Sequence, residues 1–159
     1  WRPTSSMAPS ADFTFRYDGE TAATQVGIKT PGTDGVNEIV FMHQGNENPI
    51  GLGIYFFRKS DGMLVEGDVW LNDDYSWDAT GAPSGNELDL QSAILHELGH
   101  LLSLGHDPDP DAVMYESLNA GTLKRELHAN DVAGISYIYP CNSQACNSPD
   151  VPLDPGDLG

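Results

Sequence analysis

The stretch His96–His106, HELGHLLSLGH, constrains this chain more than any other part of its sequence. Apolar residues at positions 90, 94, 98, 101 and 102 have helical spacing and predict a helix that ends at Gly105. His96 and His100 are four residues apart, so they lie one turn apart on one face of that helix. Both imidazoles can therefore reach one metal ion, and His106 is the natural third ligand once the chain turns back.

Zinc is the metal that this pattern favours. Three neutral histidines leave a zinc ion its full double charge and one open position for water, whose pKa then falls towards about 7. Glu97 stands beside the first histidine and is the candidate general base, which passes the proton of water to the leaving group. These residues alone predict the hydrolysis of an amide or ester at a single catalytic zinc ion.

Length and charge limit the kinds of protein that the chain can be. With 159 residues it can form one domain with its own core, and its apolar runs are too short to cross a bilayer. It carries 24 acidic and 7 basic residues, a formal net charge of −17. This charge argues against nucleic acid and anionic membranes as partners, because both attract basic patches. The acidity has three open explanations: a solubilising surface, Ca²⁺ sites, or adaptation to high salt.

Two cysteines, Cys141 and Cys146, lie close together near the C-terminus. We interpret them as a disulfide closing a small loop, worth about 2 kcal/mol in the chain-entropy picture, with free thiols as the alternative. A disulfide implies an oxidising compartment, so we expect a secreted protein. The chain begins at Trp1 with no visible signal peptide, and we expect a processed or trimmed sequence.

Strands are expected in the first half of the chain and helices in the second, which favours an α+β domain. Apolar patterns predict four strands: Phe13–Tyr17, Val36–Met42, Gly51–Phe57 and Leu64–Leu71. Residues 72–85, rich in Asp, Gly and Pro, predict a long loop. Helices are expected from Leu88 onward and over Ala129–Ile138, and a polar tail after Pro140.

The histidine stretch resembles the extended zinc motif of the metzincin peptidases, HExxHxxGxxH. Met114, in DAVMYES, comes eight residues after His106 and resembles the Met-turn of that family. Tyr115 follows Met114 directly, which is similar to the matrixins (matrix metalloproteinases) among the metzincins. Further stretches that resemble matrixins are DLQSAILHELGH, LHANDVAGISYIYP and EGDVWLNDDYSW. The resemblance covers about residues 31–140.

This resemblance implies an α+β, zincin-like (metzincin) domain, with a twisted mixed β-sheet, an active-site helix and a C-terminal helix. Residues 1–140 would form the catalytic domain, and residues 141–159 a tail that carries the disulfide. Trp1 falls near the end of the family's first long helix, so that helix is either missing or was removed. The implied protein is a secreted, monomeric zinc metalloendopeptidase that cleaves protein or peptide substrates.

The resemblance also implies where substrate lies. An extended peptide would lie beside an edge strand within Gly51–Phe57, in β-augmentation fashion, with Gly51, Leu52 and Gly53 as candidate contacts. A hydrophobic specificity pocket would be walled by Tyr115–Leu127, and Tyr115 is its candidate substrate-binding residue.

Several positions depart from the matrixin pattern. Ser103 replaces the glycine of the motif, and a positive φ there would cost about 1 kcal/mol unless Gly105 absorbs part of the turn. Trp70 replaces the structural-zinc histidine of animal matrixins, so the chain resembles prokaryotic-type matrixins that lack the second zinc ion. Tyr75 replaces an expected Glu, so Ca²⁺ binding by residues 72–74 stays open, with a solvated acidic loop as the alternative.

Other polar residues receive structural interpretations. Asp131 is a candidate buttress of the Met-turn, whereas Asn130 cannot form a salt link to an amino terminus. His43 and His128 are each isolated in the sequence, so we interpret them as surface or hydrogen-bonded residues and not as ligands.

Two alternative functions remain at this point. One is a binding module built on a catalytically impaired peptidase fold, against which Glu97 and the three histidines weigh. The other is a narrow-specificity zinc aminopeptidase or amidase, which would not cleave blocked peptides internally.

Overall fold

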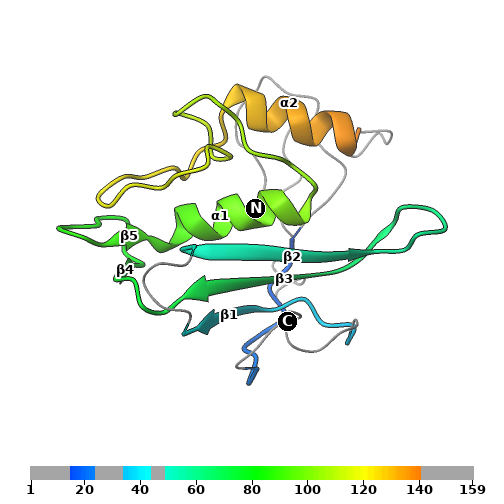
Figure 1. Cartoon of the computed structure of the whole chain (residues 1–159), viewed down its shortest axis with the longest axis horizontal. Helices are drawn as coiled ribbons and strands as arrows, with labels where there is room; N and C mark the ends of the chain where they lie inside the picture. The colour runs from blue at the N-terminus through cyan, green and yellow to red at the C-terminus, as the bar shows by residue number, and fades with distance from the viewer. Residues whose placement is uncertain (1–14, 24–33, 44–48, 141–159) are drawn as a thin grey trace, which may run out of the picture.

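A three-stranded sheet forms one layer of the computed structural model, which describes residues 15–23, 34–43 and 49–140 (Figure 1). Its strands are β1 (Ile39–Met42), β2 (Gly51–Phe57) and β3 (Leu64–Asn72), in the order β1-β3-β2. β1 runs parallel to the central strand, whereas β2 runs antiparallel to it and forms one edge. The expected edge strand over Gly51–Phe57 is therefore confirmed.

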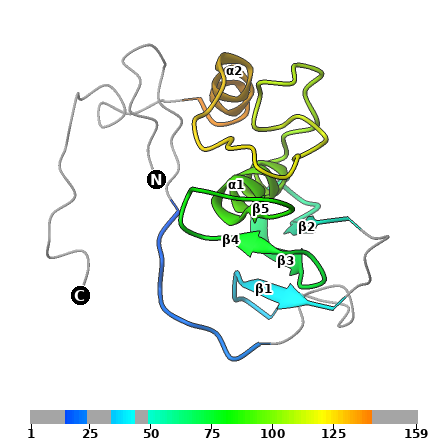
Figure 2. The same ribbon diagram turned by 90° about the vertical axis from the view of Figure 1, so that its left-hand side faces the viewer.

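Two helices lie on one side of this sheet, one above the other (Figures 1 and 2). α1 (Leu90–Leu101) packs directly against β2 and β3. The Asp89 side chain caps its N-terminus by accepting a hydrogen bond from the Ser92 backbone N. α2 (Ala129–Ile138) has the predicted bounds, and His128 and Asp131 form a capping box at its start. Among the described residues, no helix has the length and hydrophobicity to cross a membrane.

Alternation along β3 builds the core on both faces of the sheet. Side chains of successive strand residues point to opposite faces, so Val69 and Leu71 pack against α1 while Trp70 packs on the other face. The α1 side includes Ala93 and Leu101, and the opposite side includes Val40 and Met42. Trp70 is thus a buried core residue at the position where a metal-ligating histidine was considered.

Several predicted elements need correction, and one is the helix expected from Leu88 to Gly105, which begins at Leu90, because Leu88 and Asp89 lie in a short strand, and ends at Leu101. Phe15–Tyr17, the described part of the first expected strand, forms no strand, because no neighbouring strand pairs with it in the described chain. The second strand begins at Ile39 and not at Val36. The expected loop over residues 72–85 contains a short strand, β4 (Trp77–Asp78), which pairs in parallel with β5 (Leu88–Asp89).

The expected α+β metzincin architecture is confirmed for the described part of the chain. Cys141 and Cys146, the tail over residues 141–159 and Phe13 lie outside the described residues. The same holds for residues 1–14, which bear on the question of a preceding helix.

Candidate metal centre

α1 presents two of the predicted ligands, His96 and His100, on the same face. The Nδ1 atom of each ring is held by a hydrogen bond to a backbone carbonyl. The Nδ1 atom of His96 lies 2.8 Å from the carbonyl oxygen of Val113, and that of His100 lies 2.8 Å from the carbonyl oxygen of Leu104. Because a carbonyl only accepts, both Nδ1 atoms carry the proton and both Nε2 atoms keep a free lone pair. Burial lowers the pKa of His96 to about 4, so this ring is neutral at neutral pH.

The turn after α1 brings the third histidine back towards the first two. The backbone N of Ser103 donates to His100 O and that of Leu104 donates to Gly99 O, which is a Schellman motif. Ser103 occupies its left-handed position with φ 68°, as the only described non-glycine residue with positive φ. Gly105 has no positive φ, so it does not share this strain as had been considered.

His96, His100 and His106, here called the histidine cluster, converge on one point. One ring nitrogen of each lies within 4.8 Å of the others, and the ring centroids are 4.7 to 5.3 Å apart. Three imidazoles, two of which have their tautomer fixed by a backbone carbonyl, are a donor set that suits zinc. The residues present therefore fit the metal that the sequence predicts.

Glu97 is buried beside the histidine cluster and contacts the edge strand. Its Oε2 accepts a hydrogen bond of 2.7 Å from the backbone N of Gly53. Burial raises the pKa of this carboxyl group, although the charge of His100 and the bond from Gly53 oppose the rise. A Cβ at Gly53 would lie 2.8 Å from the backbone O of Glu97, so the strand can approach the helix this closely only because that residue is glycine.

Met114 lies beneath α1 in the place expected for a Met-turn. A Cβ at Gly99 would overlap the Met114 sulfur, so the helix and the turn are in close contact. Asp131 accepts hydrogen bonds from the backbone N of Val113 (2.9 Å), Met114 (3.1 Å) and His128 (2.8 Å). The predicted buttress is thus observed, and it holds the same turn whose Val113 carbonyl fixes His96.

The four residues predicted to contact substrate lie in different positions. Gly51 and Gly53 face α1 and Glu97, and the Gly53 amide is already engaged by that carboxylate. Leu52 lies on the opposite face of the strand, as alternation requires, so its backbone and not its side chain borders the cluster side. Tyr115 lies next to Met114 with the ammonium of Lys124 4.6 Å from the centre of its ring.

The other two described histidines have structural partners. His128 caps α2, and its Nδ1 accepts from Asn130 N at 3.4 Å. The Nδ1 of His43 lies 3.0 Å from Asp74 and 3.4 Å from Asp73. These three residues, here called the His43 cluster, could also hold a cation by distance, although most of the His43 side chain is exposed. The contact between His43 and the acidic residues Asp73 and Asp74 was not predicted from the sequence.

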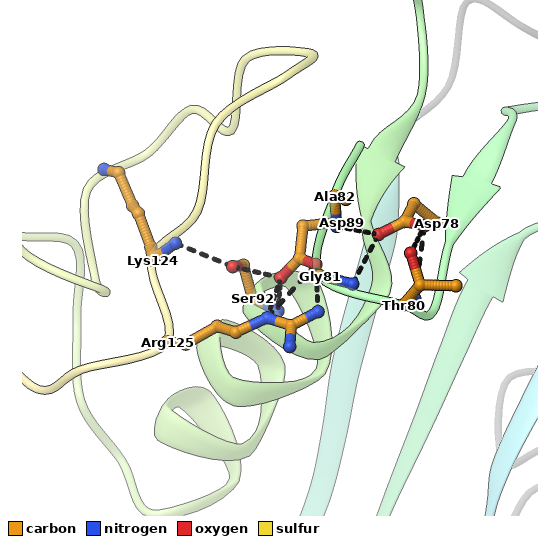
Figure 3. A network of polar contacts seen from close by, with 8 residues as sticks. All are labelled: Asp78, Thr80, Gly81, Ala82, Asp89, Ser92, Lys124 and Arg125. Carbon is orange, nitrogen blue, oxygen red and sulfur yellow. Dashed lines mark hydrogen bonds and ion pairs between the residues drawn. The ribbon is translucent and has the colours of Figure 1, made fainter. Parts of the chain in front are cut away.

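A second polar network, which sequence reasoning did not find, lies at the start of α1 (Figure 3). Arg125 binds the buried carboxylate of Asp89 through Nε, at 3.0 and 3.2 Å from its two oxygens. Asp89 and Arg125 are 36 residues apart in the sequence, so no local pattern links them. The scarcity of basic residues, 7 among 159, is the one sequence property that could have drawn attention to Arg125.

The fold and the histidine cluster together define a metzincin domain, and comparison with known proteins specifies the family. The family model described as Matrixin matches residues 39–140. Metalloendoproteinase 1 of Glycine max is 42% identical over 98 residues, which are 60% of this chain and 31% of that protein. Metalloendoproteinase 1-MMP of Arabidopsis thaliana is 44% identical over 95 residues, 58% of this chain and 25% of the relative.

Human matrilysin is more distant, with 36% identity over 79 residues, 49% of this chain and 28% of matrilysin. The chain belongs to the matrixin family. The alignments span between a quarter and a third of the length of these three relatives.

Proposed function

We propose that this protein is a zinc metalloendopeptidase in which His96, His100 and His106 hold the metal and Glu97 is the general base. The convergence of three imidazoles beside a buried carboxylate carries this proposal. A zinc ion bound there supplies Lewis acidity, which makes water a stronger acid at neutral pH. Membership of the matrixin family, whose relatives here are named metalloendoproteinases, supports the same reaction.

The surroundings of Glu97 suit a residue that accepts and returns a proton. Burial raises its pKa, which makes the ionised carboxylate a stronger base than that of an exposed glutamate. The bond from Gly53 fixes one carboxylate oxygen and leaves Oε1 to receive a proton. Glu97 would take this proton from the attacking water and donate it to the amine that leaves.

The substrate is proposed to be an extended stretch of protein or peptide. β2 is an edge of the sheet, and residues of an antiparallel edge present their backbone groups alternately to the neighbouring strand and to the open side. A peptide added there would run past Glu97 and the histidine cluster. Tyr115 is proposed to contact the same peptide.

Activity on blocked peptides tests the proposal. Wild-type protein loaded with one equivalent of zinc should cleave an internally quenched peptide library with both ends blocked, and a chelator should abolish cleavage reversibly. Glu97→Gln should lower kcat at least about 10³-fold while zinc content stays at one equivalent. The control Glu20→Gln, at an exposed glutamate outside the expected pocket wall, should retain activity. Absence of cleavage by zinc-loaded protein would overturn the proposal, and cleavage restricted to peptides with free amino termini would indicate an aminopeptidase.

The remaining expectations about the whole protein are proposals as well. We propose that it is secreted and monomeric, that residues 1–140 form its catalytic domain, and that Cys141 and Cys146 form a disulfide in the tail. Mass spectrometry after alkylation, with and without reduction, tests the disulfide. Light scattering tests the monomer, and metal analysis after dialysis against Ca²⁺ tests for calcium.

A further inference from the structure

The segment that follows Met114, Tyr115–Leu127, contains no helix or strand, and two of its backbone N–H groups bond to residues at or next to the start of α1. The backbone N of Gly121 donates to Glu87 O at 3.0 Å. The backbone N of Lys124 donates to the Ser92 hydroxyl at 2.7 Å. Two single hydrogen bonds stabilise the position of an irregular segment only weakly. A stronger interaction is therefore needed to fix the distance between this segment and α1.

Arg125 provides that anchor through the buried carboxylate of Asp89 (Figure 3). Asp89 is 0% exposed and also accepts hydrogen bonds from Ser92 N (2.9 Å) and Ser92 Oγ (2.6 Å). Burial alone would raise the pKa of Asp89, but the bonds from Arg125 and Ser92 outweigh it and hold the pKa below its ordinary value. A two-pronged contact between a guanidinium and a buried carboxylate fixes both distance and orientation.

The same guanidinium also touches a third part of the chain. A Cβ at Gly81 would lie 2.7 Å from Arg125 Nη1, so only a glycine leaves room for the arginine. Gly81 belongs to the turn that Asp78 holds by accepting hydrogen bonds from Thr80, Gly81 and Ala82 (Figure 3). The Arg125 side chain therefore lies between this turn and the start of α1, in contact with Gly81 on one side and with Asp89 on the other.

This anchor is linked to the histidine cluster along one helix face. Ser92, His96 and His100 follow one another at intervals of four residues, so the network lies one turn from the first ligand. Lys124, next to Arg125, donates from Nζ to Ala112 O at 2.9 Å and covers the ring of Tyr115. The C-terminal part of the segment is thus attached both to the start of α1 and, through Lys124, to the turn that carries the Val113 carbonyl.

We propose that Arg125 is a positioning residue for substrate selection, which through Asp89 holds Tyr115–Leu127, the expected wall of the specificity pocket, against α1. This inference rests on the proposed peptidase function. Arg125 contacts neither the histidine cluster nor Glu97 in the described structure, so it acts on which substrates bind and not on the proton transfer.

A double variant separates this role from simple capping of α1. Asp89→Asn combined with Arg125→Met removes the ion pair without leaving a buried charge, and Asn remains a good N-cap. The matched control is Asp61→Asn with Arg58→Met. This second pair has the same bidentate chemistry and lies in the β2–β3 hairpin. Its side chains are largely in solvent, with Arg58 51% and Asp61 45% exposed.

Two readouts follow from the proposal. In the first double variant, amide hydrogen exchange over Tyr115–Leu127 should rise at least about tenfold, while α1 stays protected. The ratio of kcat/KM between the best and worst residues after the cut should fall about tenfold, mainly through KM, with kcat and zinc content changed less than about threefold. The hairpin control should change neither. Arg125→Lys, which keeps the charge but not the two-pronged contact, should give an intermediate selectivity.

Unchanged exchange over the segment would overturn the proposal, and so would increased exchange with full retention of selectivity. A fall in kcat together with loss of zinc would also overturn it, because that pattern indicates a purely structural role for α1. If the wild-type protein cleaves no peptide, the proposed function fails. In that case the exchange experiment still decides whether Arg125 holds the segment.

Discussion

The described residues contain two clusters whose possible ligand atoms lie within 4.8 Å of one another, and their surroundings differ. In the histidine cluster, two rings are partly buried and use Nδ1 to bind backbone carbonyls, so each keeps Nε2 directed away from that bond. In the His43 cluster, the histidine side chain is 79% exposed and directs its Nδ1 at the carboxylates themselves. The backbone bonds of the first arrangement orient two of its three donors without requiring a metal.

This comparison teaches that closeness of donor atoms does not by itself make a metal site. An exposed His–Asp contact contributes about 0–1 kcal/mol and its side chains rearrange freely. The histidine cluster instead depends on bonds to Val113 and Leu104, and through Val113 on Asp131. The predictions below test whether these surrounding bonds are what separates the two clusters.

Removal of one ring from each cluster should give the largest contrast. His100→Ala should abolish stoichiometric zinc retention and lower peptide cleavage at least about 10³-fold, because a ligand to the metal is lost. His43→Ala should retain one equivalent of zinc and wild-type activity. Metal analysis after gel filtration measures both. Loss of zinc from His43→Ala, or two equivalents of bound zinc in the wild type, would show that the His43 cluster binds metal in spite of its exposure.

Asp131→Asn should have the next largest effect, although this residue touches no metal ligand. Its two oxygens accept three backbone N–H groups, whereas an amide would turn its NH₂ group towards at least one of them. We expect a loss of about 1–3 kcal/mol in the free energy of unfolding and a fall of about 10–100-fold in zinc affinity. Denaturant unfolding and competition with a chromogenic chelator measure the two quantities.

The corresponding change in the His43 cluster is Asp73→Asn. Since that carboxylate is about half exposed, its loss should change the unfolding free energy by less than about 0.5 kcal/mol. Equal effects of the two substitutions would contradict the view that only the histidine cluster is held by its surroundings.

Burial of Glu97 predicts a pH-dependent penalty on the stability of the metal-free protein. Its pKa is raised by burial, so below the unfolded-state value the group is protonated in both states and no penalty exists. The penalty grows as the pH rises through the unfolded pKa and is complete above the folded one. Glu97→Gln should therefore be more stable than the wild type at neutral pH, with a difference that disappears in acid. Thermal unfolding across pH, with chelator present, measures this difference.

Glu20→Gln, at an exposed glutamate, controls for the removal of one negative charge from a chain of net charge −17. A stability difference between Glu97→Gln and the wild type that stays constant from acid to neutral pH would contradict the prediction. If the inactive variant Glu97→Gln is more stable than the wild type, then the buried carboxylate beside the histidine cluster lowers stability in exchange for activity. No such effect is expected at the His43 cluster.

The part of the site that the sequence could predict is the part with local spacing. Four-residue intervals on one helix place His96 and His100, and the bounds of α2 follow from its apolar pattern. Asp131 could be anticipated only from the resemblance to matrixins. These features could be predicted because each depends on residues a few positions apart in the sequence or on a long motif.

Contacts between distant segments could not be predicted. The bond from Gly53 to Glu97 joins residues 44 apart, and the pair of Asp89 and Arg125 joins residues 36 apart. The short strand Trp77–Asp78 exists only because Leu88–Asp89 pairs with it. Strand pairing and buried ion pairs are set by tertiary packing, which the local pattern of a single sequence does not specify.

Ser103→Gly should have the smallest effect, and it concerns the turn that delivers His106. The left-handed conformation of Ser103 costs about 1–2 kcal/mol, whereas glycine adopts it freely but loses about 0.5–1 kcal/mol of extra chain entropy on folding. The substitution should therefore stabilise the protein by about 0.5–1 kcal/mol without changing zinc content, because φ at this position stays the same.

Gly62→Ser provides the mirror experiment away from the metal centre. Gly62 has φ 72° with open space around it, so serine there should destabilise the hairpin by a similar amount, about 0.5–1 kcal/mol. Urea unfolding of both variants measures the two shifts, which should be opposite in sign. If Ser103→Gly also lowers zinc affinity while Gly62→Ser leaves it unchanged, then the serine contributes to the position of His106 beyond its φ. In that case the strain at the histidine cluster is part of how the third ligand is held, a feature with no counterpart among His43, Asp73 and Asp74.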